Sequence, residues 1–269
     1  MAESGKKNDL VLECKDLSVS FSFVDGKRLP AVEGLNLSVR QHEFVALIGP
    51  SGCGKTTTLN AMAGLVPPDS GELLRKGKPV KGVGEEIGYI SQADTLLPWK
   101  NVLDNVALGL ELRGVPKSQR QEKAKVLIDR MGLNGFEKSY PHELSGGMKK
   151  RVTIARVLAI DPEMLFMDEP FGPLDAFTKE KLQDEILELW EGTTQTIVYV
   201  THDLTEAIAL ADRVVLFSAR PGRVIREYSI DLKRPRRVMD VKFEDRFVEL
   251  EKAIWTDLRG ELERAGVGL

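Results

Sequence analysis

Short runs of consecutive apolar residues recur along the chain. Four of them have the length of a β-strand and read FVALI (44–48), MLFM (164–167), TIVYV (196–200) and RVVLF (213–217). An apolar run of this length without alternation is typical of a strand that is buried on both faces of a parallel sheet. Helical patterns separate the runs, so the sequence predicts an α/β core with a mostly parallel sheet.

The N-terminal part has a different pattern, in which apolar and polar residues alternate. The stretch LVLECKDLSVSFSF (10–23) alternates in this way, and LNLSV (35–39) continues the alternation after turn-forming residues at 24–30. Alternation is typical of a strand with one buried and one exposed face. We therefore expect an antiparallel β region here, preceded by a flexible N-terminus over residues 1–10.

Residues 93–160 contain no run of the strand type. They read as amphipathic helices such as SQRQEKAKVLIDRMGL (118–133), which are joined by breaks containing Gly, Pro and Asn. This pattern predicts an α-helical subdomain inserted into the α/β core. The core would then comprise residues 11–92 and 161–230.

Residues 231–269 are expected to form a C-terminal helical tail. The tail contains the basic cluster KRPRR (233–237), which we expect to be a solvated loop rather than a site for nucleic acid. Apolar residues recur beyond it at steps of three or four, giving one apolar helix face that is expected to pack on the chain's own core. These residues are Phe243, Phe247, Leu250, Ile254, Leu258 and Leu262.

Composition narrows the choice of function classes. The 269 residues include 38 basic and 41 acidic ones, and the resulting net charge of −3 gives no strong field to attract nucleic acid. The two cysteines, Cys14 and Cys53, cannot form a disulfide framework, and no Cys/His grouping has zinc-ligand spacing, which favours a reduced, cytosolic compartment. No stretch approaches the roughly 18 apolar residues of a membrane-spanning helix. If the protein acts at a membrane, something else must hold it there.

The most specific chemical motif is GPSGCGKTT (49–57), which matches G-x-x-x-x-G-K-[ST] between a predicted strand and a predicted helix. Backbone N–H groups of such a loop bind phosphate oxygens, Lys55 can reach the β and γ phosphates, and the Thr56 hydroxyl can ligate Mg²⁺. Alkylation of Cys53 is expected to block nucleotide binding by bulk. The expected nucleotide contacts are Gly49, Pro50, Ser51, Gly52, Cys53, Gly54, Lys55, Thr56 and Thr57. Taken alone, the loop leaves kinases, GTPases and motor ATPases open.

Two carboxylates and a histidine follow predicted buried strands. Asp168 and Glu169 end the strand in MLFMDEP, where Asp168 can hold Mg²⁺ and Glu169 can act as the general base for an attacking water. His202 in VTHD ends another strand and can hydrogen-bond a γ-phosphate. No N-K-x-D segment follows a strand, which disfavours a GTPase. Phe21, or alternatively Phe23, can stack on adenine, although the pattern fits a core aromatic equally well.

Together these motifs resemble the ATP-binding subunits of ABC transporters. The matching segments in chain order are GPSGCGKTT, YISQADTLLPW, LSGGMKKR, MLFMDEP, GPLDA and VTHD. The resemblance implies a P-loop NTPase core, ATP hydrolysis with Mg²⁺, and head-to-tail pairing with a second copy or a close paralogue. Each ATP would lie between the phosphate loop of one subunit and the LSGG segment of the other. The resemblance implies integral membrane permease subunits as partners, to which a periplasmic or lipid-anchored solute-binding protein delivers the solute. It also implies a peripheral location at the cytoplasmic face of the cell membrane.

The resemblance also implies roles that spacing alone does not give. Gln92 would sense the γ-phosphate, contact the metal and couple hydrolysis to transport, while Asp175 would lie at the subunit interface. Ser145, Gly146 and Gly147 would contact the partner subunit's ATP. The helical subdomain would face the permease, with the segment after Gln92 at that contact.

Among these subunits, the chain is similar to those of bacterial importers for nitrate, sulfonate, taurine and similar small solutes. The segments LLPWKNVLDNVALGLELRG, DEPFGPLDAFT and FVELEKAIWTDLRGEL carry this resemblance. Met148 stands where glutamine is commonest, which we interpret as a mark of this branch. His42 stands where a glycine is usual, and we expect it to be a loop residue.

The alternatives are another type of ABC transporter ATPase, a soluble ABC-type ATPase acting on DNA or ribosomes, and a P-loop kinase. DNA-maintenance ATPases carry a long coiled coil between the two glycine motifs, whereas only 90 positions separate Lys55 from Ser145. Ribosome-acting ATPases carry two cassettes in one chain, and this chain has one. A kinase gives no reason for LSGG. The importer ATPase is therefore the leading hypothesis.

Overall fold

The larger of two β-sheets carries the predicted parallel core. The computed structural model describes residues 9–22, 27–172 and 174–266. The six-stranded sheet has the order β10-β9-β3-β8-β7-β6, and only the edge strand β10 is antiparallel to its neighbour. Its strands are β3 (Phe44–Ile48), β6 (Ile87–Ile90), β7 (Met164–Asp168), β8 (Thr196–Val200), β9 (Arg213–Phe217) and β10 (Val224–Ser229).

The four predicted apolar runs are the four central strands of this sheet, which confirms the α/β prediction. Alternate residues of β3 face opposite sides: Phe44, Ala46 and Ile48 belong to one buried cluster, whereas Val45 and Leu47 belong to another. The sheet is therefore covered on both faces, and this explains why its central strands are apolar throughout. The pattern misses β6 and β10, which are the two edge strands.

The smaller sheet is the expected antiparallel region, with the order β2-β1-β4-β5. Its strands are β1 (Leu10–Ser22), β2 (Arg28–Arg40), β4 (Ser70–Arg75) and β5 (Lys78–Pro79). The expectation of a turn over residues 24–30 is wrong at its end, because β2 already pairs with β1 from Arg28 onward. His42 lies in the turn after β2 with a φ of 60°, a conformation that favours glycine and explains why glycine is usual there.

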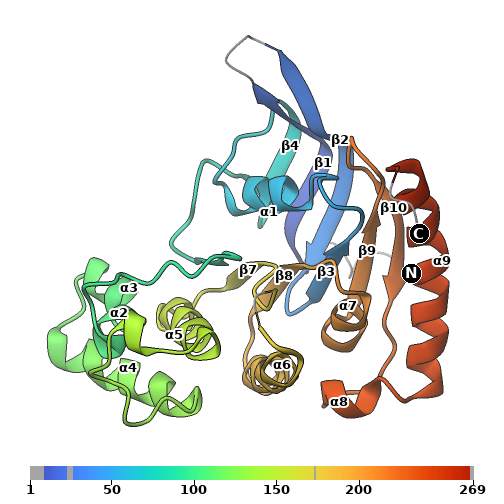
Figure 1. The fold of residues 1–269 in the computed structure, drawn as a ribbon. Coiled ribbons are helices and arrows are strands. Elements are labelled where there is room, and N and C mark those ends of the chain that lie inside the picture. Colours follow the sequence, from blue (N-terminus) through green and yellow to red (C-terminus); the bar gives the residue numbers. More distant parts are fainter. Residues whose placement is uncertain (1–8, 23–26, 173, 267–269) are drawn as a thin grey trace, which may run out of the picture.

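Helices cover both faces of the larger sheet (Figure 1). Helix α1 lies between the two sheets, while α5, α6 and α7 lie on the other face, with α2, α3 and α4 further to one side. Residues 93–160 are all described, and they contain helices and no strand. The helices are α1 (Lys55–Ala63), α2 (Val102–Val106), α3 (Leu108–Leu112), α4 (Lys117–Arg130), the 3-10 helix η1 (Pro141–Glu143), α5 (Gly146–Leu158), α6 (Ala176–Glu191), α7 (Leu204–Leu210), α8 (Val238–Val241) and α9 (Asp245–Arg264). Within the described ranges, no helix is long and apolar enough to cross a bilayer.

The C-terminal helix α9 packs beside α7 and β10, as its apolar face predicted (Figure 1). Phe247, Leu250, Ile254 and Leu258 of this face are buried, and Leu262 is partly buried against the same cluster. Phe243 is the exception: it precedes α9 and is 78% exposed, so its assignment to the buried face is wrong.

The basic cluster at 233–237 is not the solvated loop that we expected. Arg236 is 6% exposed, and its guanidinium donates to backbone carbonyls that include those of Ala211 (2.7 Å) and Leu232 (2.8 Å). Burial lowers the pKa of Arg236 to about 10. Arg234 pairs with Asp212 (2.8 Å) and lies over the ring of Trp190. These two arginines therefore fasten the start of the tail to the core.

Candidate nucleotide site

The phosphate loop joins β3 to α1, and two of its glycines lie where no side chain fits. A Cβ added at Gly49 would lie 2.9 Å from the carbonyl oxygen of Phe217, and one added at Gly54 would lie 2.5 Å from that of Ala31. Gly54 also has a φ of 103° and forms the N-cap of α1. The loop is thus packed tightly against β9 and β2, with the free N–H groups of the first turn of α1 at its end.

Lys55 lies folded back over this loop. Its Nζ donates to the carbonyl oxygens of Gly49 (2.8 Å) and Pro50 (2.9 Å), and the residue is 6% exposed. A cavity of about 310 Å³ opens beside it. The cavity is lined by Phe21, Ser51, Gly52, Gly54, Lys55, Thr56, Thr57, Asn60, Val66, Glu169 and Arg220. A held ammonium group next to a glycine-rich loop fits a polyphosphate ligand.

Not every loop residue lines this cavity. Gly49, Pro50 and Cys53 are outside its lining. Cys53 is 1% exposed, and burial raises the pKa of its thiol. The sequence-based expectation of an alkylation site in the binding loop therefore does not fit the structure, because the thiol is shielded and un-ionised near neutral pH.

The Thr56 hydroxyl donates to Oδ1 of Asp168 at 2.9 Å, which joins the phosphate loop to the end of β7. Burial raises the pKa of Asp168, and the nearby Glu169 carboxylate adds to this, whereas the Thr56 hydrogen bond acts in the opposite direction. Thr56 lines the cavity, whereas Asp168 is outside the lining and is joined to the cavity by this hydrogen bond. A hydroxyl and a carboxylate are oxygen ligands of the type that Mg²⁺ takes. The donor set of the described residues therefore fits this metal.

Glu169 and His202 meet at the carboxyl ends of β7 and β8. The Oε2 of Glu169 lies 2.9 Å from Nδ1 of His202, and the backbone N–H of Glu169 donates to the carbonyl of Val200 (2.9 Å). Glu169 has a φ of 43°, which is uncommon for a non-glycine residue and is the kind of backbone strain that clusters at functional sites. Parallel pairing of β7 with β8 brings together two residues that are 33 positions apart.

The remaining aromatic and amide candidates have different surroundings. Phe21 is 47% exposed and lines the cavity, whereas Phe23 lies outside the described residues. Gln92 follows β6 and is exposed, but it does not line the cavity. The Nε2 of Gln92 would lie 3.7 Å from a Cβ added at Gly172, so Gln92 lies beside the segment that follows Glu169.

The LSGG segment begins helix α5. Ser145 is its N-cap and accepts a hydrogen bond from the N–H of Met148 at 3.3 Å, while Gly146 and Gly147 form its first turn. A Cβ added at Gly147 would lie 2.7 Å from Cγ2 of Thr178. Thr178 in turn donates its N–H to Asp175, the N-cap of α6. Hydrogen bonds from Thr178, first from its side chain and then from this N–H, lower the pKa of that carboxyl. Gly147 and Asp175 thus both lie against Thr178, and Ser145, Gly146, Gly147 and Asp175 are absent from the cavity lining.

Sequence reasoning missed two groups around this site. Arg220, which follows β9, lines the cavity and donates from Nε to the carbonyl of Gly52 (3.2 Å). Its place three residues after a buried strand is the signal that could have revealed it. The second group surrounds Glu206, a 5% exposed carboxylate in the helix after His202. Its partners are Tyr199 (2.5 Å), Thr201 (2.6 Å), Lys179 (2.6 Å) and Gln183 (3.0 Å).

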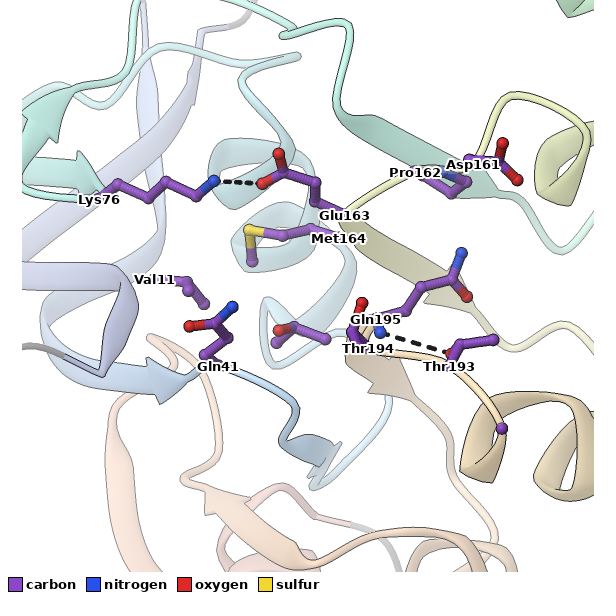
Figure 2. Close-up of a pocket in the computed structure, with 12 residues that line it drawn as sticks. Val11, Gln41, Lys76, Asp161, Pro162, Glu163, Met164, Thr193, Thr194 and Gln195 are labelled. Carbon is purple, nitrogen blue, oxygen red and sulfur yellow. Dashed lines mark hydrogen bonds and ion pairs between the residues drawn. The ribbon is translucent and has the colours of Figure 1, made fainter.

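A larger cavity of about 550 Å³ lies at the opposite, amino-terminal ends of β7 and β8 (Figure 2). Lys76 and Glu163 form an ion pair on its wall. None of the motif residues lines it, and the cationic side chain in its lining is paired. It therefore lacks the phosphate-binding features of the cavity at the phosphate loop.

The fold and the cavity at the phosphate loop define a P-loop nucleotide-binding protein, and comparisons with known proteins narrow this class. Residues 32–172 match the family model described as ABC transporter. An uncharacterized ABC transporter ATP-binding protein of Methanocaldococcus jannaschii is 47% identical over 96% of each chain. The taurine import ATP-binding protein TauB of Escherichia coli K12 is 45% identical over 81% of this chain and 86% of its own.

Solved structures agree with this match. The ATP-binding cassette MJ0796, in a dimeric post-hydrolysis state with ADP and Pi, has a TM-score of 0.73 and 29% identity, and the match covers 82% of this chain and all of that one. CbiO1 of Clostridium perfringens, part of the ABC transporter complex CbiONQ, has the same TM-score and 26% identity, and the match covers 96% of this chain and 98% of that one. The chain belongs to the ABC transporter family, and it is an ATP-binding subunit that hydrolyses ATP.

Proposed function

We propose that this chain powers a bacterial importer for a small solute such as nitrate, taurine or another sulfonate. The similarity to the taurine import protein, over four fifths of the chain, supports the importer branch. The observation that carries the catalytic part is the pairing of Glu169 with His202, because Glu169 lines the same cavity as Lys55 and Thr56. His202 itself is outside the lining and reaches the cavity through Glu169.

The described residues divide the chemistry of hydrolysis among them. Lys55 and the loop N–H groups bind the β and γ phosphates of ATP, while Thr56 and Asp168 hold Mg²⁺, with Gln92 as an additional ligand. Mg²⁺, when bound, neutralises charge that develops on the phosphate oxygens. Glu169 accepts a proton from the attacking water, and His202 orients that carboxylate and hydrogen-bonds the γ-phosphate.

We assign the LSGG segment to the ATP of a second subunit. Ser145, Gly146, Gly147 and Asp175 do not line the cavity of their own chain, and the side chains of Ser145 and Asp175 bond to Met148 and Thr178, which do not line it either. Asp168 and His202 differ, because each bonds to a residue that lines the cavity. The N-terminus of α5 supplies N–H groups suited to an anion. The similar cassette MJ0796 was solved as a dimer with ADP and Pi. A head-to-tail pair would complete each site with this segment.

Residues 93–160 would form the subdomain that faces the permease, inserted between the core parts 11–92 and 161–230. Trp99 is 71% exposed and Leu112 is 80% exposed, so this subdomain offers large apolar side chains for a protein contact. The subunit would then lie at the cytoplasmic face of the membrane, with the solute delivered outside by a binding protein. No nucleic-acid partner is part of this proposal.

Reconstitution tests this function directly. The chain would be co-expressed with the permease subunits encoded beside it and placed in liposomes, and ATP hydrolysis would be measured with the neighbouring solute-binding protein, loaded or empty. Stimulation by taurine, a sulfonate or nitrate on the binding protein is expected, and Glu169→Gln should abolish it. Stimulation only by a chemically unrelated solute would assign the chain to another type of ABC transporter. Purification with ribosomes or DNA and no membrane protein would favour a soluble ATPase.

A further inference from the structure

The loop after β9, residues 218–223, packs directly behind the phosphate loop. Gly222 donates its N–H to Ala31 (2.8 Å), and its carbonyl accepts from Glu33 (3.1 Å). A Cβ added at Gly222 would lie 2.1 Å from the carbonyl oxygen of Cys53, so the two backbones are in contact. Ser218 closes the loop by accepting the N–H of Arg223 (3.0 Å). The path of loop 218–223 is therefore fixed relative to the phosphate loop.

The same loop is held from its other side by the C-terminal helix. Oε2 of Glu261, in the last turns of α9, accepts the N–H of Ala219 at 2.9 Å. Glu261 is 4% exposed, which is unusual for a carboxylate unless its hydrogen bonds are satisfied. Helix α9 is itself anchored to the core by its buried apolar face. The tail thus reaches the residue that precedes Arg220.

Arg220 projects from this fixed loop to the cavity. Its Nε donates to the carbonyl of Gly52, and it lines the cavity together with Phe21 and Lys55. Arg220 is exposed. Within the described parts of the chain, its side chain donates only from Nε, and neither of its terminal amino groups has a hydrogen-bond acceptor or an ion-pair partner. A guanidinium group with two unused amino groups beside a phosphate loop is suited to phosphate oxygens.

We infer that Arg220 is an additional binding residue for the phosphates of ATP, and that Glu261 is its positioning residue. This inference rests on the proposed nucleotide site and extends it, because it makes the C-terminal helix part of the site. Arg220 supplies positive charge from the β9 side, opposite the metal-side pair of Thr56 and Asp168. Glu261 acts through the Ala219 N–H and does not touch the nucleotide.

Nucleotide titration of matched variants tests the role of Arg220. Arg220→Met removes the guanidinium, whereas Arg223→Met is the control, since Arg223 belongs to the same loop and is exposed but pairs with Glu33 outside the cavity. Dissociation constants would be measured for ATP and ADP, with adenosine as a competitor. We expect Arg220→Met to raise the dissociation constants of ATP and ADP about tenfold and to leave that of adenosine unchanged. Tenfold corresponds to the lower end of the free energy of a hydrogen bond to a charged group. Its ATP affinity should also depend less on salt.

An ATP affinity of Arg220→Met equal to that of Arg223→Met would overturn the inference, as would an equal loss for adenosine. Lys55→Met separates this result from a failure of the proposed function. If the wild-type chain binds ATP and Lys55→Met does not, the site stands and only the role of Arg220 is at stake. If the wild-type chain fails to bind ATP, the proposed function itself fails.

A double-mutant cycle tests the positioning role of Glu261. Glu261→Ala should weaken the binding of ADP by about threefold in the wild-type background. It should have no further effect in Arg220→Met, because both changes act through the contact between Arg220 and the phosphates. Glu263→Ala is the control, since Glu263 lies two residues on and pairs with Arg259 at the surface. Glu261→Gln, which keeps an acceptor oxygen, should retain the wild-type affinity for ADP. Glu261→Met, which lacks an acceptor and has a similar length, serves if Glu261→Ala does not fold. Additive losses in the double variant would contradict the positioning role.

Discussion

The carboxylate of Glu169 and the imidazole of His202 are 2.9 Å apart, and each is carried by the end of a different parallel strand. The glutamate side chain is 24% exposed and that of the histidine 62%. The histidine is thus the more exposed of the two side chains, and its contact with the carboxylate allows it to orient that group. We propose that this pair is the centre of the hydrolytic site.

Loss of the imidazole should slow hydrolysis without weakening nucleotide binding. In His202→Ala, Glu169 loses the partner that orients it, so kcat should fall about a hundredfold, the range of a general acid–base contribution, while the ATP dissociation constant changes little. Steady-state hydrolysis and ATP titration would be compared with those of His142→Ala, a histidine of the 3-10 helix η1 that stacks on Tyr140. An unchanged kcat would remove His202 from the mechanism.

The cluster around Glu206 should stabilise the segment that carries His202. Lys179 lies 2.6 Å from Glu206 and 2.7 Å from Asp203, so Lys179→Met leaves one buried and one partly buried carboxylate without their cation. We expect the free energy of unfolding to fall by about 2 kcal/mol at pH 7, less than for a fully buried pair because Lys179 is partly exposed. Urea unfolding would measure the loss, and Lys181→Met on the same helix is the control.

This loss should depend on pH in a defined direction. Although burial opposes ionisation of Asp203, the contact with Lys179 holds the pKa of that carboxyl below its usual value. A depressed pKa gives stability that is present above the unfolded pKa of about 4 and is lost as the pH falls through the folded pKa. The difference between wild type and Lys179→Met should therefore be largest near neutral pH and shrink below about pH 4. A difference that grows on acidification would contradict the assignment.

The parts predicted from the sequence are those in which local pattern and burial agree. Strand β3 was predicted because both of its faces are covered, whereas the edge strand β10 is largely polar and exposed and gave no signal. Motif spacing predicted Lys55, Asp168 and Glu169 because a strand, a loop and a helix fix their order along the chain. The structure adds which side chains meet there.

Other features depend on contacts that no local pattern contains. Arg236 is buried because carbonyl groups from residues 208–211 and 230–232 surround its guanidinium, and those groups come from two separate segments. Arg220 joins the nucleotide cavity through the close approach of Gly222 to Cys53. In both cases the sequence shows a basic residue in a loop, and only the tertiary fold determines its surroundings.

Both thiols should react slowly in the folded protein. Burial raises the pKa of Cys14 to about 12 and also raises that of Cys53, so little thiolate is present at pH 8. Iodoacetamide at pH 8 should modify both cysteines in urea and neither at a comparable rate in the native chain, as read by mass spectrometry. Rapid native labelling of Cys53 that ATP prevents would instead support an exposed thiol in the binding loop.

A charge in the LSGG segment should separate binding from hydrolysis. In Ser145→Arg the phosphate loop of the same chain is intact, so the isolated subunit should bind ATP with nearly wild-type affinity. Hydrolysis should be lost, because the arginine side chain prevents the LSGG segment from completing the partner subunit's ATP site. Ser139→Arg, outside this segment, is the control for added charge. ATP titration at low protein concentration and hydrolysis at high concentration give the two readouts. Weaker binding by the isolated variant would place Ser145 in its own subunit's site.

The most direct test of a site shared by two subunits is the size of Glu169→Gln with and without ATP. Without its general base, the variant should bind ATP and turn it over at least about a hundredfold more slowly, so that nucleotide stays between the subunits. Light scattering after size exclusion should then show a dimer with ATP and a monomer with ADP. A variant that hydrolyses ATP at the wild-type rate, or that remains a monomer with saturating ATP, would contradict the account.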